Sequence, residues 1–140
     1  MEAHALWQGK SRIELNDGRG HRVVVDLPES EGGEDAGTSG LELALLSFAA
    51  CVLTIFPLVA RRRRIQIESM ELDMVGHRGP RAPTIERVDG TLRLRSSATP
   101  EEAETALRLT VRTCPVGVLF ERAGVPVQLR LEPIGALVTA

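Results

Sequence analysis

The sequence predicts a mixed fold in which β-strands surround one long apolar helix. Residues 43–60 carry no charged side chain, and Ser39 followed by Glu42 is a capping-box pattern that begins a helix at about residue 40. Before and after this segment, short runs are rich in β-branched residues or alternate apolar with polar residues, as half-buried strands do. A helix without a polar face is expected to be buried on all sides, which in a small domain favours a second subunit that covers part of it.

The composition is that of one globular domain. The 140 residues are 43% hydrophobic with a formal net charge of -2, so we expect a single domain over residues 1–140 and no nucleic acid partner. The first residues lack the basic start and apolar run of a signal peptide, which predicts a cytoplasmic protein. The histidines at 4, 21 and 77 have no metal-ligand spacing, so no metal site is expected.

Alternation and capping signals place the remaining elements. Strands are expected at residues 5–15, 22–27, 65–75, 85–95 and 125–134, with loops at 31–40 and 76–83. Thr99 is an N-cap residue followed by a proline and two glutamates, which predicts a helix over residues 100–112. A short helix is expected to follow, with Cys114 as its cap and its end near Gly124.

The uncharged segment also has the minimum length for a membrane span. It is 18 residues long and is followed by Arg61–Arg64, as a span with a basic cytoplasmic flank would be. However, Ser47, Cys51 and Thr54 make one side of the helix small and weakly polar. Pro57 is expected to kink or end it. We therefore favour a buried central helix and interpret the arginines as its solvated end.

Two cysteines are the residues best suited to chemistry. Cys51 lies in the apolar helix, and Cys114 precedes a proline at a helix start. A thiol in a water-poor groove and a second thiol elsewhere in the fold are the minimum equipment for reversible sulfur redox chemistry. A buried cysteine alone is more often core filling, so a nearby cation is needed to favour the thiolate. Backbone N–H groups at the helix start should make Cys114 the easier of the two to deprotonate.

These features together resemble the osmotically inducible protein C and organic hydroperoxide resistance (OsmC/Ohr) family, in its OsmC-like subgroup. The resemblance rests on residues 37–51, where a cysteine follows the glutamate of Leu-Glu-Leu by nine residues, on the basic helix end, on the Thr-Pro-Glu-Glu helix and on Cys114-Pro115-Val116. It covers roughly residues 20–133. It implies an α+β fold of the OsmC-like type, an intertwined homodimer with a long central helix packed between β-sheets.

The resemblance also implies a thiol-dependent peroxidase that takes part in an oxidative stress response. In that chemistry Cys51 attacks an organic hydroperoxide, becomes a sulfenic acid and condenses with Cys114 into a redox-active disulfide. No metal or organic cofactor is required. The implied reductant is a dithiol, such as a lipoylated protein.

In this family an arginine from the N-terminal strands holds the thiolate. The candidates here are Lys10, Arg12 and Arg19. Alternation along residues 5–15 places Arg12 on the same side as Lys10, and a guanidinium can hold both a thiolate and a carboxylate, which favours Arg12.

Glu42 would orient that arginine. Nine residues of helix turn about 900° and rise roughly 13 Å, so Glu42 and Cys51 cannot touch within one chain. Glu42 must then reach the thiol of the partner subunit or act through a bend; otherwise it is only a capping residue. Leu41 occupies the position where the hydroperoxide-resistance subgroup carries its glutamate. This displacement keeps open an alternative, a dimer that binds an apolar small molecule between its subunits without peroxide turnover.

Overall fold

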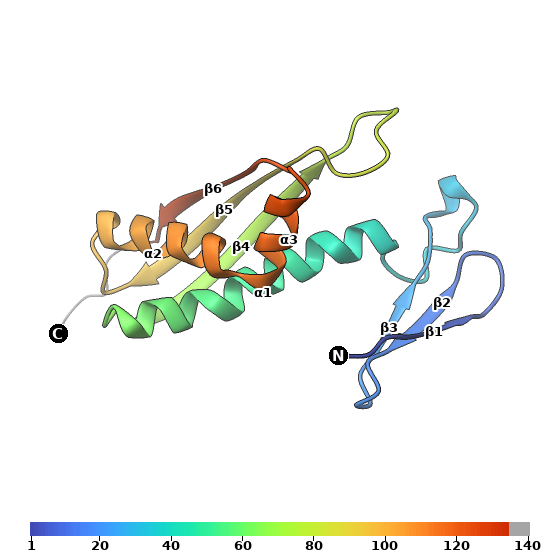
Figure 1. The fold of residues 1–140 in the computed structure, drawn as a ribbon, viewed down its shortest axis with the longest axis horizontal. Helices are drawn as coiled ribbons and strands as arrows, with labels where there is room; N and C mark the ends of the chain where they lie inside the picture. The colour runs from blue at the N-terminus through green and yellow to red at the C-terminus, as the bar shows by residue number, and fades with distance from the viewer. Residues whose placement is uncertain (135–140) are drawn as a thin grey trace. The chain divides into compact units, whose positions relative to one another are not determined.

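The chain divides into two compact units, Met1–Ala44 and Leu45–Ala140. A computed structural model describes residues 1–134, so the last six residues of the expected single domain lie outside the described part (Figure 1). The long helix α1 (Gly40–Arg62) begins at the end of the first unit and continues into the second. Its start at residue 40 is as predicted.

The first unit is an antiparallel meander of three short strands. Its strands β1 (His4–Trp7), β2 (Ile13–Asn16) and β3 (Arg22–Val25) pair in the order β1-β2-β3. The register aligns Trp7, Ile13 and Val25 across the sheet, and Ala5, Leu15 and Val23 likewise. One face of this sheet is therefore apolar, because residues that pair directly across strands point to the same side.

The prediction of one strand over residues 5–15 is wrong, because a hairpin turn interrupts it. Gly9 and Lys10 have φ values of 105° and 50°, in the left-handed region. The turn is closed by the N–H of Gln8 donating to the Arg12 carbonyl at 2.9 Å and the N–H of Arg12 donating to Gly9 at 3.1 Å. Apolar and polar residues alternate similarly before and after the turn, so the pattern does not show that the chain reverses direction there. The glycine was the signal for it.

Asp26 ties this hairpin turn to the loop that follows β3. Its side chain is 1% exposed and accepts hydrogen bonds from the Ser11 hydroxyl at 2.5 Å and from the N–H groups of Leu27, Glu34 and Ala36 at 2.8 to 3.1 Å. The Ser11 hydrogen bond, and then these N–H groups, lower the pKa of Asp26 to about 2. A buried carboxylate thereby keeps its charge through hydrogen bonds and organises the loop, which contains the 3-10 turn η1 (Glu29–Glu31).

The second unit contains a mixed sheet. Strands β4 (Ile67–His77) and β5 (Arg87–Ser96) are antiparallel, and β6 (Val127–Pro133) lies parallel to β5 on its other side. The parallel pairing requires a crossover, which α2 (Pro100–Thr113) and α3 (Pro115–Arg122) supply. All five elements are confirmed, and their boundaries lie within two residues of those predicted.

The core of this unit lies between the sheet and two helices. α1 contributes Phe56 and Ala60 to it, and α1 and α2 lie on the same side of the sheet (Figure 1). The other buried residues lie just before β4, in β5 and in α2: Ile65, Leu92, Leu94, Ala103, Ala106 and Leu107. The opposite face of the sheet is charged: Arg93 of β5 forms ion pairs with Glu71 and Asp73 of β4. This is the alternation of a half-buried sheet.

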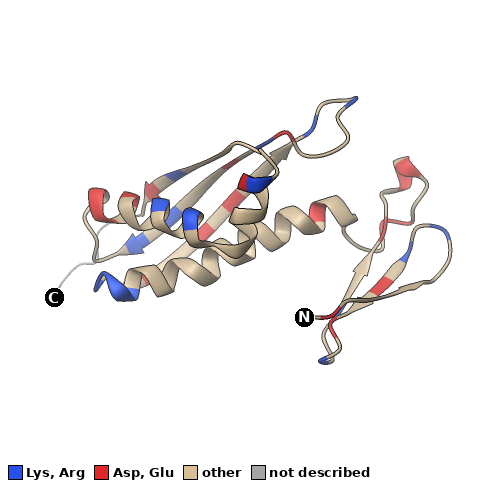
Figure 2. Cartoon of the chain, viewed as in Figure 1, with Lys and Arg blue, Asp and Glu red and all other residues tan. Residues whose placement is uncertain are grey.

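Helix α1 is buried along one stripe only. Phe48, Val52, Phe56 and Ala60 are completely buried, whereas Leu46 and Leu58 are 54% and 53% exposed. Figure 2 shows that its charged residues gather at its two ends and leave the length between them without charge. By length and composition α1 could span a membrane, and 22% of its most apolar window is buried in this chain. The expected burial on all sides is not reached within one chain.

Pro57 does not end α1, which continues to Arg62. A proline removes one helical hydrogen bond and crowds the preceding turn. Phe56 and Ala60, on either side of Pro57, are fully buried in the core. Their packing stabilises the helical path on both sides and offsets the missing hydrogen bond.

Candidate active site

Helix α1 holds Cys51 at the edge of its buried stripe. Cys51 comes one helical turn after Phe48 and directly before Val52, two residues with no exposed surface. The Cys51 side chain is itself only half-buried. The neighbouring buried side chains thus fix the helix against the core while the thiol stays accessible from one side.

Cys114 is the single residue between α2 and α3, and it caps both. Its N–H donates to the Thr110 carbonyl at 2.7 Å, which closes α2, and its carbonyl accepts from the Val118 N–H at 2.9 Å. Its sulfur accepts from the Gly117 N–H at 3.4 Å, which opens α3. Cys114 has no exposed surface. The predicted cap at this residue is confirmed.

The fold brings the two cysteines together. Both are free thiols, and the Cys51 thiol helps to raise the pKa of Cys114, so the two side chains interact although they come from α1 and from the α2–α3 junction. Both residues lie in the second unit. The two thiols therefore form one site with an accessible sulfur and a buried sulfur.

Cys114 is a poor acid in this environment. Burial first, and then the neighbouring Cys51 thiol, raise the pKa of the Cys114 thiol to about 11, against the smaller opposing effect of the Gly117 and Val116 N–H groups. The expectation that the helix start would make Cys114 easy to deprotonate is wrong. The complete burial of the thiol raises its pKa by more than the two N–H groups at the start of the eight-residue helix α3 lower it. The Cys114 thiol is therefore protonated at neutral pH.

Gly117 allows α3 to approach this site closely. A Cβ atom at this position would lie 2.8 Å from the Val111 carbonyl oxygen and 3.2 Å from Phe48 Cε2. The Phe48 ring stacks on Phe120 with a centroid distance of 4.7 Å. The sequence analysis did not assign these residues to the site. A glycine inside a short helix is unfavourable, and this was the signal that could have identified Gly117.

The three candidate cations have local partners within the first unit. Lys10 Nζ contacts Glu34 at 2.7 Å, and Arg19 contacts Asp17 at 3.1 Å. Arg12 donates from Nε to the Gln8 side chain at 3.1 Å and has no carboxylate partner within residues 1–134. Arg12 lies in the hairpin turn, so the strand alternation that linked it to Lys10 does not apply. Its uncommitted charge is the observation that still favours it.

Glu42 is a helix-capping residue. Its carboxylate accepts the Ser39 N–H at 2.7 Å and the Thr38 hydroxyl at 3.3 Å, and its own N–H donates to the Ser39 hydroxyl at 3.3 Å. These hydrogen bonds, the one from the Ser39 N–H first, lower the pKa of Glu42. The capping box is confirmed, and it leaves the carboxylate ionised.

The residues described by the structure contain no group of three or more His, Cys, Asp or Glu side chains that could hold a metal ion.

Comparison with known proteins identifies the family. The model of the OsmC-like protein family matches residues 32–130, which include both thiols. The chain belongs to the OsmC-like family. Comparison with curated proteins gives no match.

Solved OsmC-like structures share this fold. An OsmC-like protein from Mycoplasma pneumoniae is 15% identical, with 96% of each chain covered and a TM-score of 0.85. The Legionella pneumophila organic hydroperoxide resistance protein OsmC is 21% identical, with 94% of this chain and 95% of that chain covered and a TM-score of 0.71. The organic hydroperoxide resistance protein OhrB of Bacillus subtilis is 20% identical, with 94% of this chain and 96% of that chain covered and a TM-score of 0.64. At these identities the likeness establishes the fold.

The predicted membership of the OsmC-like family is thus confirmed. The segment matched by the family model includes Cys51, Cys114 and Glu42, whereas Arg12 lies before it. The roles of these four residues remain predictions.

Proposed function

We propose that this OsmC-like protein is a cytoplasmic, homodimeric, thiol-dependent peroxidase that reduces organic hydroperoxides. The observation that supports this most is the pair of free thiols, in which a half-buried Cys51 interacts with a completely buried Cys114 and helps to raise its pKa. A peroxide can approach only the first sulfur, and a second sulfur lies ready behind it.

The first step oxidises Cys51. Its sulfur attacks one peroxide oxygen, the O–O bond breaks, and the remaining alkoxide takes a proton and leaves as an alcohol. Cys51 becomes a sulfenic acid, so two electrons pass from sulfur to the peroxide. Cys114 keeps its proton through this step because its pKa is about 11. We expect its S–H to donate to the Cys51 sulfur during this step and to stabilise negative charge there.

The second step forms the disulfide. The Cys114 sulfur attacks the Cys51 sulfur, the S–O bond breaks, and the thiol proton leaves with the hydroxyl group as water. A dithiol reductant then attacks the more accessible sulfur, Cys51, and releases Cys114 as the leaving thiol. A second exchange within the reductant frees Cys51 and yields the oxidised reductant.

Arg12 and Glu42 complete the proposed site. Arg12 stabilises the Cys51 thiolate, and Glu42 orients that arginine. Since Glu42 precedes Cys51 by nine residues on α1, it serves the thiol of the partner subunit. The homodimer is supported by the exposed apolar length of α1, including Leu46 and Leu58, which a second copy would cover.

The test is peroxide consumption with dithiothreitol as the reductant. We expect cumene hydroperoxide to be consumed faster than hydrogen peroxide, and Cys51→Ser to abolish the reaction. Thr54→Ala is the matched control, because Thr54 lies one turn further along α1 and bonds only to the Ala50 carbonyl among the described residues. Equal loss of activity in both variants would contradict the assignment of Cys51.

A second candidate function is binding of an apolar small molecule in the groove between subunits, without turnover. It is favoured by the capping interactions of Glu42, whose carboxylate is already occupied by Ser39 and Thr38. Saturable ligand binding by a protein that consumes no peroxide would select this function over the peroxidase.

A further inference from the structure

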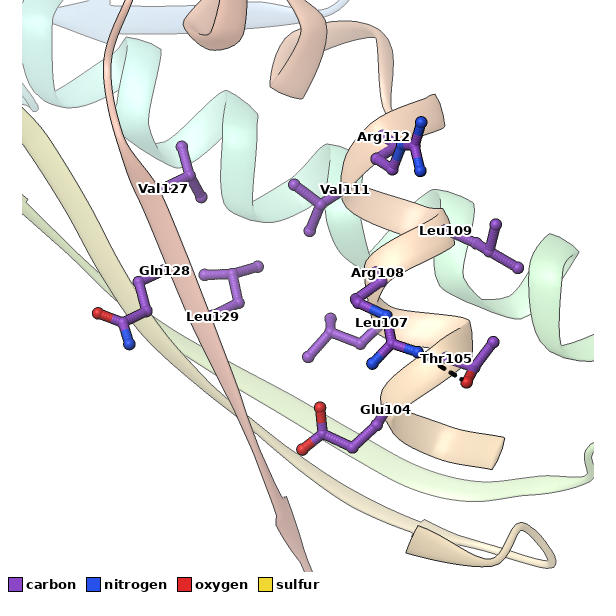
Figure 3. Close-up of a pocket in the computed structure, with 10 residues that line it drawn as sticks. All are labelled: Glu104, Thr105, Leu107, Arg108, Leu109, Val111, Arg112, Val127, Gln128 and Leu129. Atoms are coloured by element: carbon purple, nitrogen blue, oxygen red, sulfur yellow. Dashed lines mark hydrogen bonds between the residues drawn. The ribbon is translucent and has the colours of Figure 1, made fainter. Parts of the chain in front are cut away.

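A hollow lies on the surface of the second unit, between α2 and β6. It is a groove of about 530 Å³, a volume in the range of small-molecule sites. Leu107 and Val111 of α2 face Val127 and Leu129 of β6 across it, as Figure 3 shows. Its floor is therefore aliphatic. Neither cysteine lines it.

Charged side chains border the groove on α2 only. Glu104, Arg108 and Arg112 follow one another at four-residue intervals, so they lie along one side of the helix (Figure 3). Arg108 donates to the Thr105 hydroxyl at 3.0 Å. Among residues 1–134, neither arginine has a carboxylate within ion-pair distance. By contrast, Arg93 on the sheet contacts two carboxylates.

An apolar floor beside two guanidinium groups that have no carboxylate partner among residues 1–134 matches an amphipathic anion. We propose that this groove binds a medium-chain aliphatic carboxylate, with its carboxylate on Arg112 and Arg108 and its alkyl chain along the aliphatic floor. A guanidinium binds a carboxylate through two parallel hydrogen bonds, which selects this head group. This site is separate from the proposed peroxidase site and does not depend on it.

Glu104 sets the direction of the ligand. Its carboxylate lies at the end of the groove opposite Arg112 and repels an anionic head group there. Eight residues of helix separate the two side chains, a rise of about 12 Å. The alkyl chain therefore extends from Arg112 past Leu107 toward the Glu104 end.

A second copy of the chain is a poorer occupant. In a two-fold contact the same patch meets itself, so the arginines of one subunit would approach those of the other. Two arginines and a single glutamate, Glu104, give the patch a net positive charge, which opposes its contact with a second copy of itself.

The test is calorimetric titration of the reduced protein with decanoate below its micelle-forming concentration. We expect saturable binding of one decanoate per chain, about tenfold weaker binding of decan-1-ol because it lacks the ionic contact, and no binding of decyltrimethylammonium. Arg112→Gln should weaken decanoate binding about tenfold and leave decan-1-ol binding unchanged. Arg130→Gln is the control, since Arg130 is an exposed arginine of β6 that does not line the groove.

Backbone NMR shifts locate the ligand, and we expect changes at Val127 and Leu129. Equal affinity for decanoate and decan-1-ol, or an unchanged affinity in Arg112→Gln, would refute the proposed head-group site. Shift changes centred on Cys51 would place the ligand elsewhere and also refute it. Cys51→Ser should bind decanoate normally. If the protein binds decanoate but has no peroxidase activity, the groove proposal stands and the peroxidase proposal fails. If it is an active peroxidase that does not bind decanoate, only the groove proposal fails.

Discussion

Gly117→Ala tests the packing that holds the two thiols together. The added Cβ atom would approach the Val111 carbonyl oxygen to 2.8 Å, a distance that real Cβ atoms essentially never adopt, and Phe48 Cε2 to 3.2 Å. Because the carbonyl belongs to helix backbone and the Phe48 ring is fully buried, neither can move freely. The variant must shift α3, and with it Cys114.

The magnitude follows from two opposing effects. Alanine is favoured over glycine within a helix by about 1 kcal/mol. Overpacking of a filled core costs roughly 1–3 kcal/mol. We expect the overpacking to exceed the helix preference, so that the free energy of unfolding falls by up to about 2 kcal/mol. Disulfide formation after peroxide should also slow, because the Cys114 sulfur moves with α3.

Denaturant unfolding and the rate of thiol loss after one equivalent of peroxide measure these two effects. Gly40→Ala is the matched control, because a Cβ atom at the start of α1 meets nothing within 4 Å. The control should be as stable as the original protein or slightly more stable. If Gly117→Ala is equally stable and forms the disulfide at the original rate, the proposed close approach of α3 is wrong.

Three further predictions concern charge, thiol reactivity and assembly. The pKa of Asp26 is about 2, below the unfolded value near 3.9, so the stability it contributes is present above pH 4 and is lost as the pH falls toward 2. Asp26→Asn should therefore lower stability at pH 7 and weaken its dependence on pH between 4 and 2; an unchanged pH dependence would reject this role. Because Cys114 is fully buried with a pKa of about 11, iodoacetamide at pH 8 should label it far more slowly in the folded than in the unfolded protein. Mass spectrometry after timed labelling measures the two rates, and similar rates would contradict this prediction. The exposed apolar length of α1 predicts a dimer at micromolar concentration, and light scattering that finds a folded 15.2 kDa monomer would exclude it.

Local signals were sufficient for most of the fold. The capping boxes at Ser39 and Thr99 fixed the starts of two helices, because their hydrogen bonds involve only residues three positions apart. Alternation identified β4 and β5, whose faces differ in burial. The turn at Gly9 was missed because the apolar alternation is similar in β1 and β2.

The candidate site depended more on tertiary contacts. The pairing of Cys51 with Cys114 was reached through the family resemblance, since 62 residues separate them and no local pattern connects them. The raised pKa of Cys114 could not be predicted, because the burial that causes it comes from packing beyond its own helix. Asp26 looked like the end of a strand, and only the fold shows the four hydrogen bonds that keep it charged while buried.

The central claim is that the two thiols form one redox pair, and mass spectrometry after one equivalent of an organic hydroperoxide tests it most directly. Our account predicts that both thiols disappear together and that a Cys51–Cys114 disulfide forms within one chain. Cys114→Ser should react once and then over-oxidise at Cys51, because no second thiol traps the sulfenic acid. Two free thiols after the peroxide has been consumed, or a Cys51→Ser variant with full activity, would contradict the account.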